Sequence, residues 1–479
     1  MIMSSVKTQT INSTKWNALE KVTVQGIQFV LTLIMARLLL PSDYGTVGML
    51  AIFIAVSQSF IDSGFNTALI RKPDATEKDF CTVFYFNVGI AVVVYIFLFF
   101  LAPYVAQFFR IPILCSVLRV YAISLFINSF MAVQVAMLHI KLDFKSLAKR
   151  NVCATLISGV FGILLAYFGC GIWALVFQNI IASIINLIFI CYICRWYPKS
   201  AFSMESFRQL GAFGSRILAS SLLNQLYKNL TTFAIGKFYS PNDLGFYTRG
   251  AQYAHLPNQS INGVLSTVTY PILARIQNDD SHLLNVYKRY IQISSMCIFI
   301  ISGLLCALAK PIVLLTLTDK WENSIIYLQL FAFSCMFDHL NTINLNLLKV
   351  KGRSELFFKL EVVKKTISLA ILACAIPFGV LAICLSKLLY NQIAVFINTY
   401  YTGKLLHYGY TEQFSDFLPY FIRVVIACLP AFFLTFVPIP YIFSIFFGGG
   451  IGLGLYCFML RKDKNMLELF FLIKSKFYK

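Results

Sequence analysis

The sequence is poor in charged residues and poorest in acidic ones. Only 13% of its 479 residues are charged, and the 20 Asp and Glu are half as many as the 40 Lys and Arg. A soluble chain of this length leaves about a quarter of its unfolded-chain surface in water and needs polar residues to cover it. Hydrophobic residues make up 58% of this chain. A soluble globular protein is therefore excluded, and an all-α polytopic membrane protein is predicted.

Motifs for catalysis and nucleotide binding are also missing. The sequence contains no Walker A loop, no HExxH, no GxSxG and no acidic cluster at metal-ligand spacing. The 13 cysteines lie mostly within apolar segments, where Cys behaves as a small apolar residue. Cys191 and Cys194 form one CxxC without a second pair or a nearby His, so zinc and redox chemistry are not expected. We expect no enzyme, no cofactor and no metal.

The formal charge of +20 would suggest a nucleic-acid partner in a soluble protein. Here the basic residues lie mainly in short loops between apolar segments, without a stripe of Lys and Arg interleaved with exposed aromatic residues. Membrane topology explains this distribution, because cytoplasmic loops are enriched in Lys and Arg. Nucleic acid is therefore not expected as a partner.

Apolar segments of helical length predict fourteen membrane spans. Their expected ranges are 22–40, 44–65, 80–109, 113–140, 152–168, 172–194, 214–236, 246–271, 290–315, 324–348, 366–378, 380–401, 417–437 and 441–460. Minimal turns, Gly169-Cys-Gly and Phe378-Gly379, predict antiparallel hairpins for the fifth and sixth and for the eleventh and twelfth spans. The segment 195–213 is expected to be a hydrophilic linker with a short surface helix.

The basic residues also predict the orientation. They are concentrated in the two terminal tails and in alternate loops, at 66–79, 140–151, 195–213, 272–289, 349–365 and 402–416. The opposite side has only Arg37, Arg110, Lys237, Arg249, Lys310 and Lys320. Both termini are therefore expected to be cytoplasmic.

The segment 25–45 occurs a second time, two hundred positions later. Its Pro41, Asp43 and Gly45 correspond to Pro241, Asp243 and Gly245, and its polar positions correspond as well. Such a repeat is typical of transporters built from two similar halves. Six spans per half is an even number, so both halves enter the membrane in the same direction. We expect two parallel six-helix repeats at 1–200 and 201–403, and an additional helix pair with a basic tail at 404–479.

Polar residues within the spans are the candidates for a substrate path. A charge at the bilayer centre costs at least about 2.5 to 3.5 kcal/mol, so Lys228 is expected to face water or a partner. Together with Asn224 and Gln225 it forms one polar stripe at helical spacing. The expected lining of a net positive cavity is Lys228, Arg249, Gln25, Gln28, Asn224, Gln225, Gln252, His255, Arg216 and Arg119. Asn258, Gln259 and Asn262 lie further along the expected span 246–271, which also holds Arg249, Gln252 and His255.

A structural alternative stands beside this interpretation. Amide side chains in membrane helices often bond neighbouring helices, and Arg216, Lys387 and Arg423 can snorkel or pair. Asp62 is either an ion-coupling residue or an interfacial one. His255 and His339, which follows Asp338, can titrate or can form ordinary helix contacts.

Three segments resemble a known family. They are Ala36-Arg37-Leu38-Leu39 before Pro41-Ser-Asp-Tyr-Gly45, Asp62-Ser-Gly64-Phe-x-x-Ala68-Leu-Ile70, and Phe168-Gly-x-Gly-x-Trp173-Ala-Leu175. They resemble the bacterial polysaccharide transporter family, the O-antigen and exopolysaccharide flippases of the multidrug/oligosaccharidyl-lipid/polysaccharide exporter superfamily. The resemblance extends over essentially the whole chain.

The resemblance implies a V-shaped transporter in the bacterial inner membrane. It implies translocation of undecaprenyl-pyrophosphate-linked oligosaccharide by alternating access, with membrane lipid and other polysaccharide-assembly proteins as further partners. A cationic cavity suits a pyrophosphate group. Two alternatives remain: a cation-coupled multidrug exporter of the same superfamily, which should have acidic cavity residues, and a membrane-embedded glycosyltransferase or polymerase, which should have a large outer loop.

Overall fold

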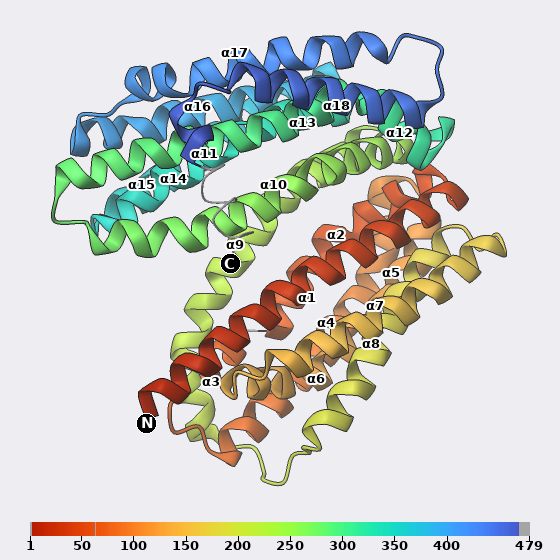
Figure 1. Ribbon diagram of the computed structural model, residues 1–479. Helices are drawn as coiled ribbons and strands as arrows, with labels where there is room; N and C mark the ends of the chain where they lie inside the picture. The colour runs from red at the N-terminus through yellow and green to blue at the C-terminus, as the bar shows by residue number, and fades with distance from the viewer. Residues whose placement is uncertain (1, 63, 469–479) are drawn as a thin grey trace. The chain divides into compact units, whose positions relative to one another are not determined.

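The computed structural model describes residues 2–62 and 64–468, with the backbone alone at 2–15, 17, 18, 22, 259–262, 264–268, 271 and 354. Every regular element in these ranges is helical, which confirms the all-α class (Figure 1). Backbone N–H and C=O groups in a bilayer must be hydrogen-bonded within the protein, and helices achieve this within one segment. The side chains of Gln259 and Asn262 lie outside the described set.

The chain divides into two compact units, 1–245 and 246–479, which are described separately. The first unit contains α1 (Ile2–Leu38), α2 (Pro41–Asp62), α3 (Phe65–Arg71), α4 (Glu77–Phe109), α5 (Ile113–Tyr121), α6 (Ile123–Ile140), α7 (Phe144–Tyr167), α8 (Ile172–Cys194) and α9 (Met204–Phe238). Helix α10 (Pro241–Arg275) begins in the first unit and continues into the second.

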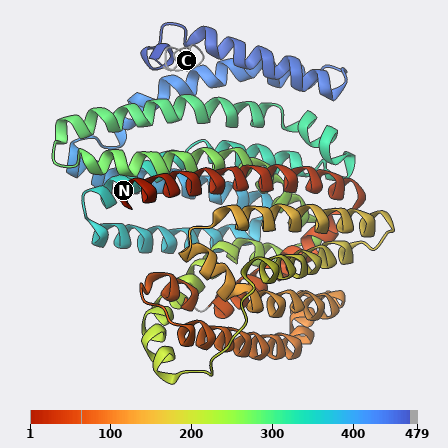
Figure 2. The ribbon, with the colours of Figure 1, turned by 60° about the horizontal axis from the view of Figure 1, so that its bottom comes forward.

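The second unit contains the remaining helices. They are α11 (Asp280–Ala307), α12 (Ala309–Leu317), η1 (Asp319–Trp321), α13 (Ser324–Cys335), α14 (Asp338–Val350), α15 (Ser354–Ala375), η2 (Ile376–Phe378), α16 (Val380–Leu406), α17 (Tyr410–Leu434) and α18 (Tyr441–Met459). Helix α17 packs against α11 and α18, and α17 and α18 form the blue pair in Figures 1 and 2.

The division differs from the expected boundaries at 200/201 and 403/404. Helix α9 packs on α2, α3 and α4, so the helix that was expected to open the second half is part of the first compact unit. The predicted surface helix of the linker is the beginning of α9 itself, since Ser203 caps the helix through a hydrogen bond from the Ser206 N–H. The segment 404–479 is part of the second unit because α17 packs on α11.

Ten helical stretches of the described residues are long and apolar enough to cross a membrane. The expected spans in α9, α10, α13–α14 and α15 are not among them. Helices α9 and α10 carry most of the polar residues singled out from the sequence. The expected span 324–348 is two helices, α13 and α14, interrupted at Met336 and Phe337. Fourteen spans therefore remain a prediction.

The predicted hairpins are confirmed. Helix α7 packs along α8, and α15 packs along α16. Gly169 and Gly171 have φ of 77° and 53°, and Gly379 has φ of 102°. Residues with a side chain rarely adopt such positive φ values. Glycine, which has none, therefore allows these turns to be short.

The Pro-x-Asp-x-Gly segments begin α2 and α10. Pro41 and Pro241 are the first residues of their helices, where a missing N–H is tolerated. Two residues later, a carboxylate bonds the N–H before the proline: the Leu40 N–H donates to Asp43 at 3.0 Å, and the Ser240 N–H donates to Asp243 at 3.2 Å. The motif is therefore a helix-start signal in both copies.

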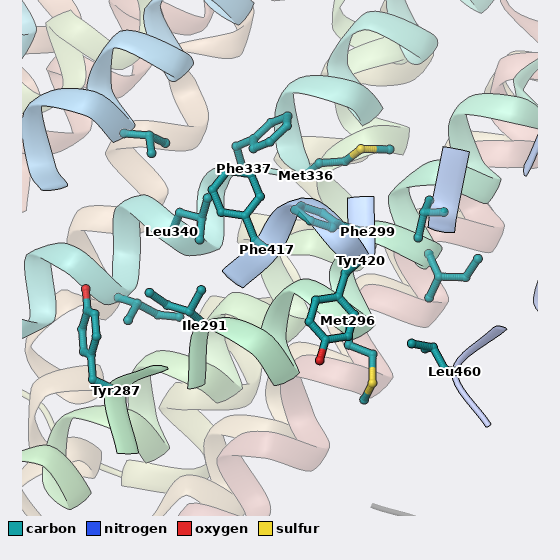
Figure 3. Close-up of a cluster of buried hydrophobic side chains, with 14 of the residues drawn as sticks. Tyr287, Ile291, Met296, Phe299, Met336, Phe337, Leu340, Phe417, Tyr420 and Leu460 are labelled. Atoms are coloured by element: carbon teal, nitrogen blue, oxygen red, sulfur yellow. The ribbon is translucent and has the colours of Figure 1, made fainter. Parts of the chain in front are cut away.

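An aromatic core fixes the interruption between α13 and α14. Phe337 lies at the interruption, and its ring centroid is 5.7 Å from that of Phe299 in α11 and 6.2 Å from that of Phe417 in α17 (Figure 3). Met336 is buried in the same cluster. Because these two side chains are held in the core, the end of α13 and the start of α14 have fixed positions. Figure 3 shows Phe337 above Phe417 and beside Met336.

Helix α4 has an apolar face that the described side chains leave exposed. Val93, Phe97, Phe100 and Tyr104 recur at helical spacing and are 62 to 68% exposed. An exposed stripe of this size is unusual in a soluble protein and is expected on a helix that faces lipid.

Candidate functional site

Helix α9 carries the cationic stripe of the first unit. The side chains of Arg216, Asn224 and Lys228 are exposed, and Gln225 is half-buried. The helix packs on α2, and the hydroxyls of Ser221 in α9 and Ser59 in α2 are 3.3 Å apart. Asn224 and Lys228 lie one turn apart, so an amide and an ammonium group point from the same side of α9.

Helix α1 carries the corresponding amides. Gln28 is exposed and Gln25 is half-buried, and α1 packs along α7. The two stripes lie on different helices, and their participation in one cavity remains a prediction.

Arg119 in α5 is engaged with α4. Its Nε donates to the Phe99 carbonyl at 3.2 Å, and its guanidinium lies 4.1 Å from the centroid of the Phe99 ring. A hydrogen bond and a cation–π contact together are a sufficient structural reason for this arginine. The structure does not bring Arg119 together with Lys228.

Asp62, at the end of α2, belongs to a chain of amides. It is exposed and accepts a hydrogen bond from Gln58 at 3.1 Å. Gln58 in turn accepts one from Asn128 of α6 at 3.4 Å. This carboxylate joins two helices through neutral partners, and its role in ion coupling is untested.

In the second unit, α10 brings three of the predicted residues together. Arg249 is buried, donates to Gln252, and stacks 5.7 Å from the Trp321 ring. Gln252 is exposed and His255 is half-buried. The three residues recur at every third position and therefore share one face of the helix. Arg249 is itself buried, and its hydrogen bond orients the Gln252 side chain.

The interruption between α13 and α14 is the centre of a polar network. An interrupted membrane helix has carbonyls without helical partners, and these need other donors. The Asn258 amide of α10 donates to the Cys335 carbonyl at 2.9 Å and to Asp338 at 3.1 Å. The Asn391 amide of α16 donates to the Ser334 carbonyl and to Asp338, both at 2.8 Å. Two neighbouring helices therefore stabilise the interruption.

The network continues along α14 and α16. Asn341 donates to Asn391 at 2.8 Å, and Asn398 donates to Asn341 at 2.7 Å. Asn344 exchanges hydrogen bonds with Gln413 of α17. These residues are not among the candidates predicted from the sequence. The available signal was the helical spacing within each helix: Asn341 and Asn344 are three residues apart, and Asn391 and Asn398 are seven apart.

Lys387 lies beside this network. Its side chain is exposed, with the ammonium 5.1 Å from the centroid of the Phe331 ring. It interacts electrostatically with Tyr247, Asp338 and Cys335. It is therefore an accessible cation near an acidic group, an arrangement that the sequence suggested only weakly.

The two histidines differ in their surroundings. His339 is fully buried, with Nε2 2.8 Å from the Ser295 hydroxyl, so it is a helix contact. His255 is half-buried, with Nδ1 3.3 Å from the Cys335 sulfur. Among the described residues, His255, Cys335 and Asp338 are a group whose donor atoms lie within 4.8 Å of one another.

Comparisons with known proteins agree with this helical architecture. The solved structure of the lipid II flippase MurJ in an inward closed conformation is similar, with a TM-score of 0.72, 13% identity, and coverage of 94% of this chain and 99% of that chain. An inward-facing multidrug resistance transporter of the MATE family and MOP superfamily has a TM-score of 0.62 and 15% identity, over 81% of this chain and 98% of that chain. At these identities the likeness shows the fold.

Curated relatives are similar over most of the chain. The teichuronic acid biosynthesis protein TuaB of Bacillus subtilis is 24% identical over 74% of both chains. The lipopolysaccharide biosynthesis protein WzxC of Escherichia coli is 24% identical over 75% of this chain and 74% of its own. A family model described as polysaccharide biosynthesis protein matches residues 34–326. This match covers more than half of the sequence, and the chain belongs to the polysaccharide biosynthesis protein family.

Proposed function

We propose that this chain is a flippase that translocates undecaprenyl-pyrophosphate-linked oligosaccharide units across the bacterial inner membrane by alternating access, for O-antigen, capsule or exopolysaccharide assembly. The family match supports this proposal, as do relatives named for teichuronic acid, lipopolysaccharide and, in Rhizobium meliloti, succinoglycan transport. The fold it shares with a lipid II flippase supports it too. In this proposal the protein moves its substrate and performs no covalent chemistry.

The exposed ammonium of Lys228 on α9 is the observation that carries the proposal. A lysine in a helix of a membrane protein needs water or an anion as its partner. A diphosphate supplies two adjacent anionic groups, and a cation in a weakly screened site binds them strongly. The amides of Asn224 and Gln225 beside it on α9, and those of Gln25 and Gln28 on α1, provide donors and acceptors for sugar hydroxyls in this proposal.

The remaining candidate residues are assigned different roles. We assign Arg216, Gln252 and His255 to further polar contacts with the headgroup, because their side chains are at least partly exposed. Arg249 and Arg119 have positioning roles, since both guanidinium groups are stacked on rings of their own unit. Asp62 is kept as the candidate for ion coupling. Both termini are placed in the cytoplasm, where other polysaccharide-assembly proteins can reach the basic loops.

The test replaces Lys228 with alanine in a strain that depends on this chain for surface polysaccharide. We expect surface polysaccharide to fall at least roughly tenfold, because one charge-assisted contact of the diphosphate is lost, and lipid-linked units to accumulate on the cytoplasmic face. Arg208→Ala is the matched control. Arg208 is an exposed cation in the first part of α9, outside the expected span. Normal surface polysaccharide in a folded, inserted Lys228→Ala protein would remove Lys228 from the proposal.

A cation-coupled multidrug exporter is the second candidate, because the fold is shared with a multidrug resistance transporter. Such a pump is expected to bind cationic drugs through acidic residues, whereas the charged residues of α9 within the expected span 214–236 are Arg216 and Lys228, which are both basic and exposed. Drug efflux from vesicles reconstituted with the purified chain, driven by a cation gradient, would favour this candidate over the flippase.

A further inference from the structure

Three donor atoms of different chemistry converge beside the interrupted helix of the second unit. They are Nδ1 of His255 in α10, the sulfur of Cys335 at the end of α13, and a carboxylate oxygen of Asp338 at the start of α14. All lie within 4.8 Å of one another, and the nitrogen-to-sulfur distance is 3.3 Å. A tetrahedral zinc ion with bonds of about 2.0 to 2.3 Å holds its ligand atoms roughly 3.3 to 3.8 Å apart, which the nitrogen-to-sulfur distance already meets. We propose that His255, Cys335 and Asp338 bind a divalent transition metal of the zinc class.

The ligands are already held in place by other helices. Asp338 receives one amide hydrogen bond on each oxygen, from Asn258 and from Asn391. Asn258 also bonds the carbonyl of Cys335, which fixes the backbone next to the sulfur. Metal-binding carboxylates are commonly oriented by such hydrogen bonds, and losing one weakens metal affinity by roughly 10- to 100-fold.

The donor set selects the class of metal. Sodium, magnesium and calcium prefer sites made entirely of oxygen. A mixed set of imidazole, thiolate and carboxylate suits zinc and the neighbouring first-row ions. Three protein ligands leave one coordination position for water, and His255 and Asp338 are partly exposed, so an ion can enter. A bound ion would tie α10 to the junction of α13 and α14.

The positive charge of Lys387 determines whether its removal tightens or weakens metal binding. Binding adds two positive charges and releases the thiol proton of Cys335, so the charge of the site rises by one. The ammonium of Lys387 interacts with Asp338 and Cys335 and opposes this rise. Removing the ammonium with Lys387→Met is therefore expected to tighten metal binding roughly tenfold.

Cobalt is the probe, because it takes the place of zinc and reports a thiolate ligand through a near-ultraviolet charge-transfer band. The purified full chain in detergent is treated with a chelator, titrated with Co²⁺, and then with Zn²⁺. We expect the band to appear in the wild type and to be removed by Zn²⁺. The thermal denaturation midpoint of each variant without metal shows whether it is folded.

Two cysteine variants and one histidine variant decide the assignment. Cys335→Ser should lack the band, and Cys384→Ser should keep it, because Cys384 is a buried cysteine of the same unit outside the group. His255→Gln should weaken binding by at least about tenfold and tests the proposal separately if Cys335→Ser does not fold. No band in the wild type, or an unchanged band in Cys335→Ser, would overturn the proposal.

Discussion

The side chain of Asn391 in α16 makes four hydrogen bonds with the two helices that flank the interruption, α13 and α14. Its amide N–H groups reach the Ser334 carbonyl, the Ser334 hydroxyl and Asp338, and its carbonyl accepts from Asn341. Buried polar groups are expensive to leave unbonded. The interruption therefore depends on a residue of a different helix, more than fifty positions away along the chain.

Asn391→Leu tests this dependence. The substitution keeps the size of the side chain and removes all its hydrogen bonds. Hydrogen bonds within membrane proteins average about 0.6 kcal/mol each, so the expected loss of folding free energy is about 2 kcal/mol. The measurement is thermal denaturation of the purified chain in detergent. Asn179→Leu is the control, because the exposed Asn179 amide bonds only a carbonyl of its own helix, that of Leu175 at 2.8 Å. Equal effects of the two variants would contradict this account.

At this scale the sequence predicted some residues and not others. The stripe of Asn224, Gln225 and Lys228 and the grouping of Arg249, Gln252 and His255 are patterns of helical periodicity, which acts within one helix, and their part in a substrate path stays a prediction. The group of His255, Cys335 and Asp338 does not follow, because its members lie on three helices and their spacing in the sequence matches no metal motif. Only tertiary packing brings them together.

The starts of α2 and α10 approach each other closely at their glycines. A Cβ atom at Gly45 would overlap the carbonyl oxygen of Pro241, and one at Gly245 would overlap the carbonyl oxygen of Pro41. The two copies of the Pro-x-Asp-x-Gly motif thus meet backbone to backbone, each glycine against the proline of the other. The conserved length of the motif between the two copies is explained by this reciprocal contact.

Gly45→Ala and Gly245→Ala are expected to destabilise the first unit strongly. Each added methyl group meets backbone, which cannot rotate away as a side chain can, so we expect a loss of about 3 kcal/mol. Detergent thermal denaturation and the yield of folded protein measure it. Gly89→Ala in α4 is the matched control, because a Cβ there meets nothing within 4 Å and alanine favours a helix. A neutral Gly45→Ala would show that the two turns do not pack in this way.

The sequence predicted the elements with short glycine turns and missed the interruptions. Gly169, Gly171 and Gly379 are visible signals because of the positive φ that each turn needs. The interruption at Met336 and Phe337 carries neither proline nor glycine. It is set by aromatic packing on Phe299 and Phe417 and by amides from two other helices. These are tertiary causes, and no local pattern contains them.

For the whole molecule, the number of membrane crossings determines which loops share a side. The positive-inside distribution predicts that the turn between α7 and α8 lies outside and that the turn between α14 and α15 lies in the cytoplasm. That result requires an odd number of crossings between the turns: α8, α9, α10, α11 and the pair α13–α14. By apolar length alone only α8 and α11 qualify among these helices, and two crossings would return the chain to the same side.

Reporter fusions distinguish these counts. Alkaline phosphatase is active only outside the cytoplasm, and green fluorescent protein fluoresces inside it. We expect the phosphatase to be active when fused after residue 170 and the fluorescent protein to be bright when fused after residue 352. A fusion after residue 200 is the control, since α8 alone separates it from residue 170 and both counts place those two sites on opposite sides. Phosphatase activity at both 170 and 352 would place both sites outside. The polar helices α9 and α10 and the pair α13–α14 would then contribute an even number of crossings, and the predicted count of three would be wrong. The polar residues of α9 would then have lost the physical reason for facing a substrate path, because only a lysine held within the bilayer must find water or an anion there.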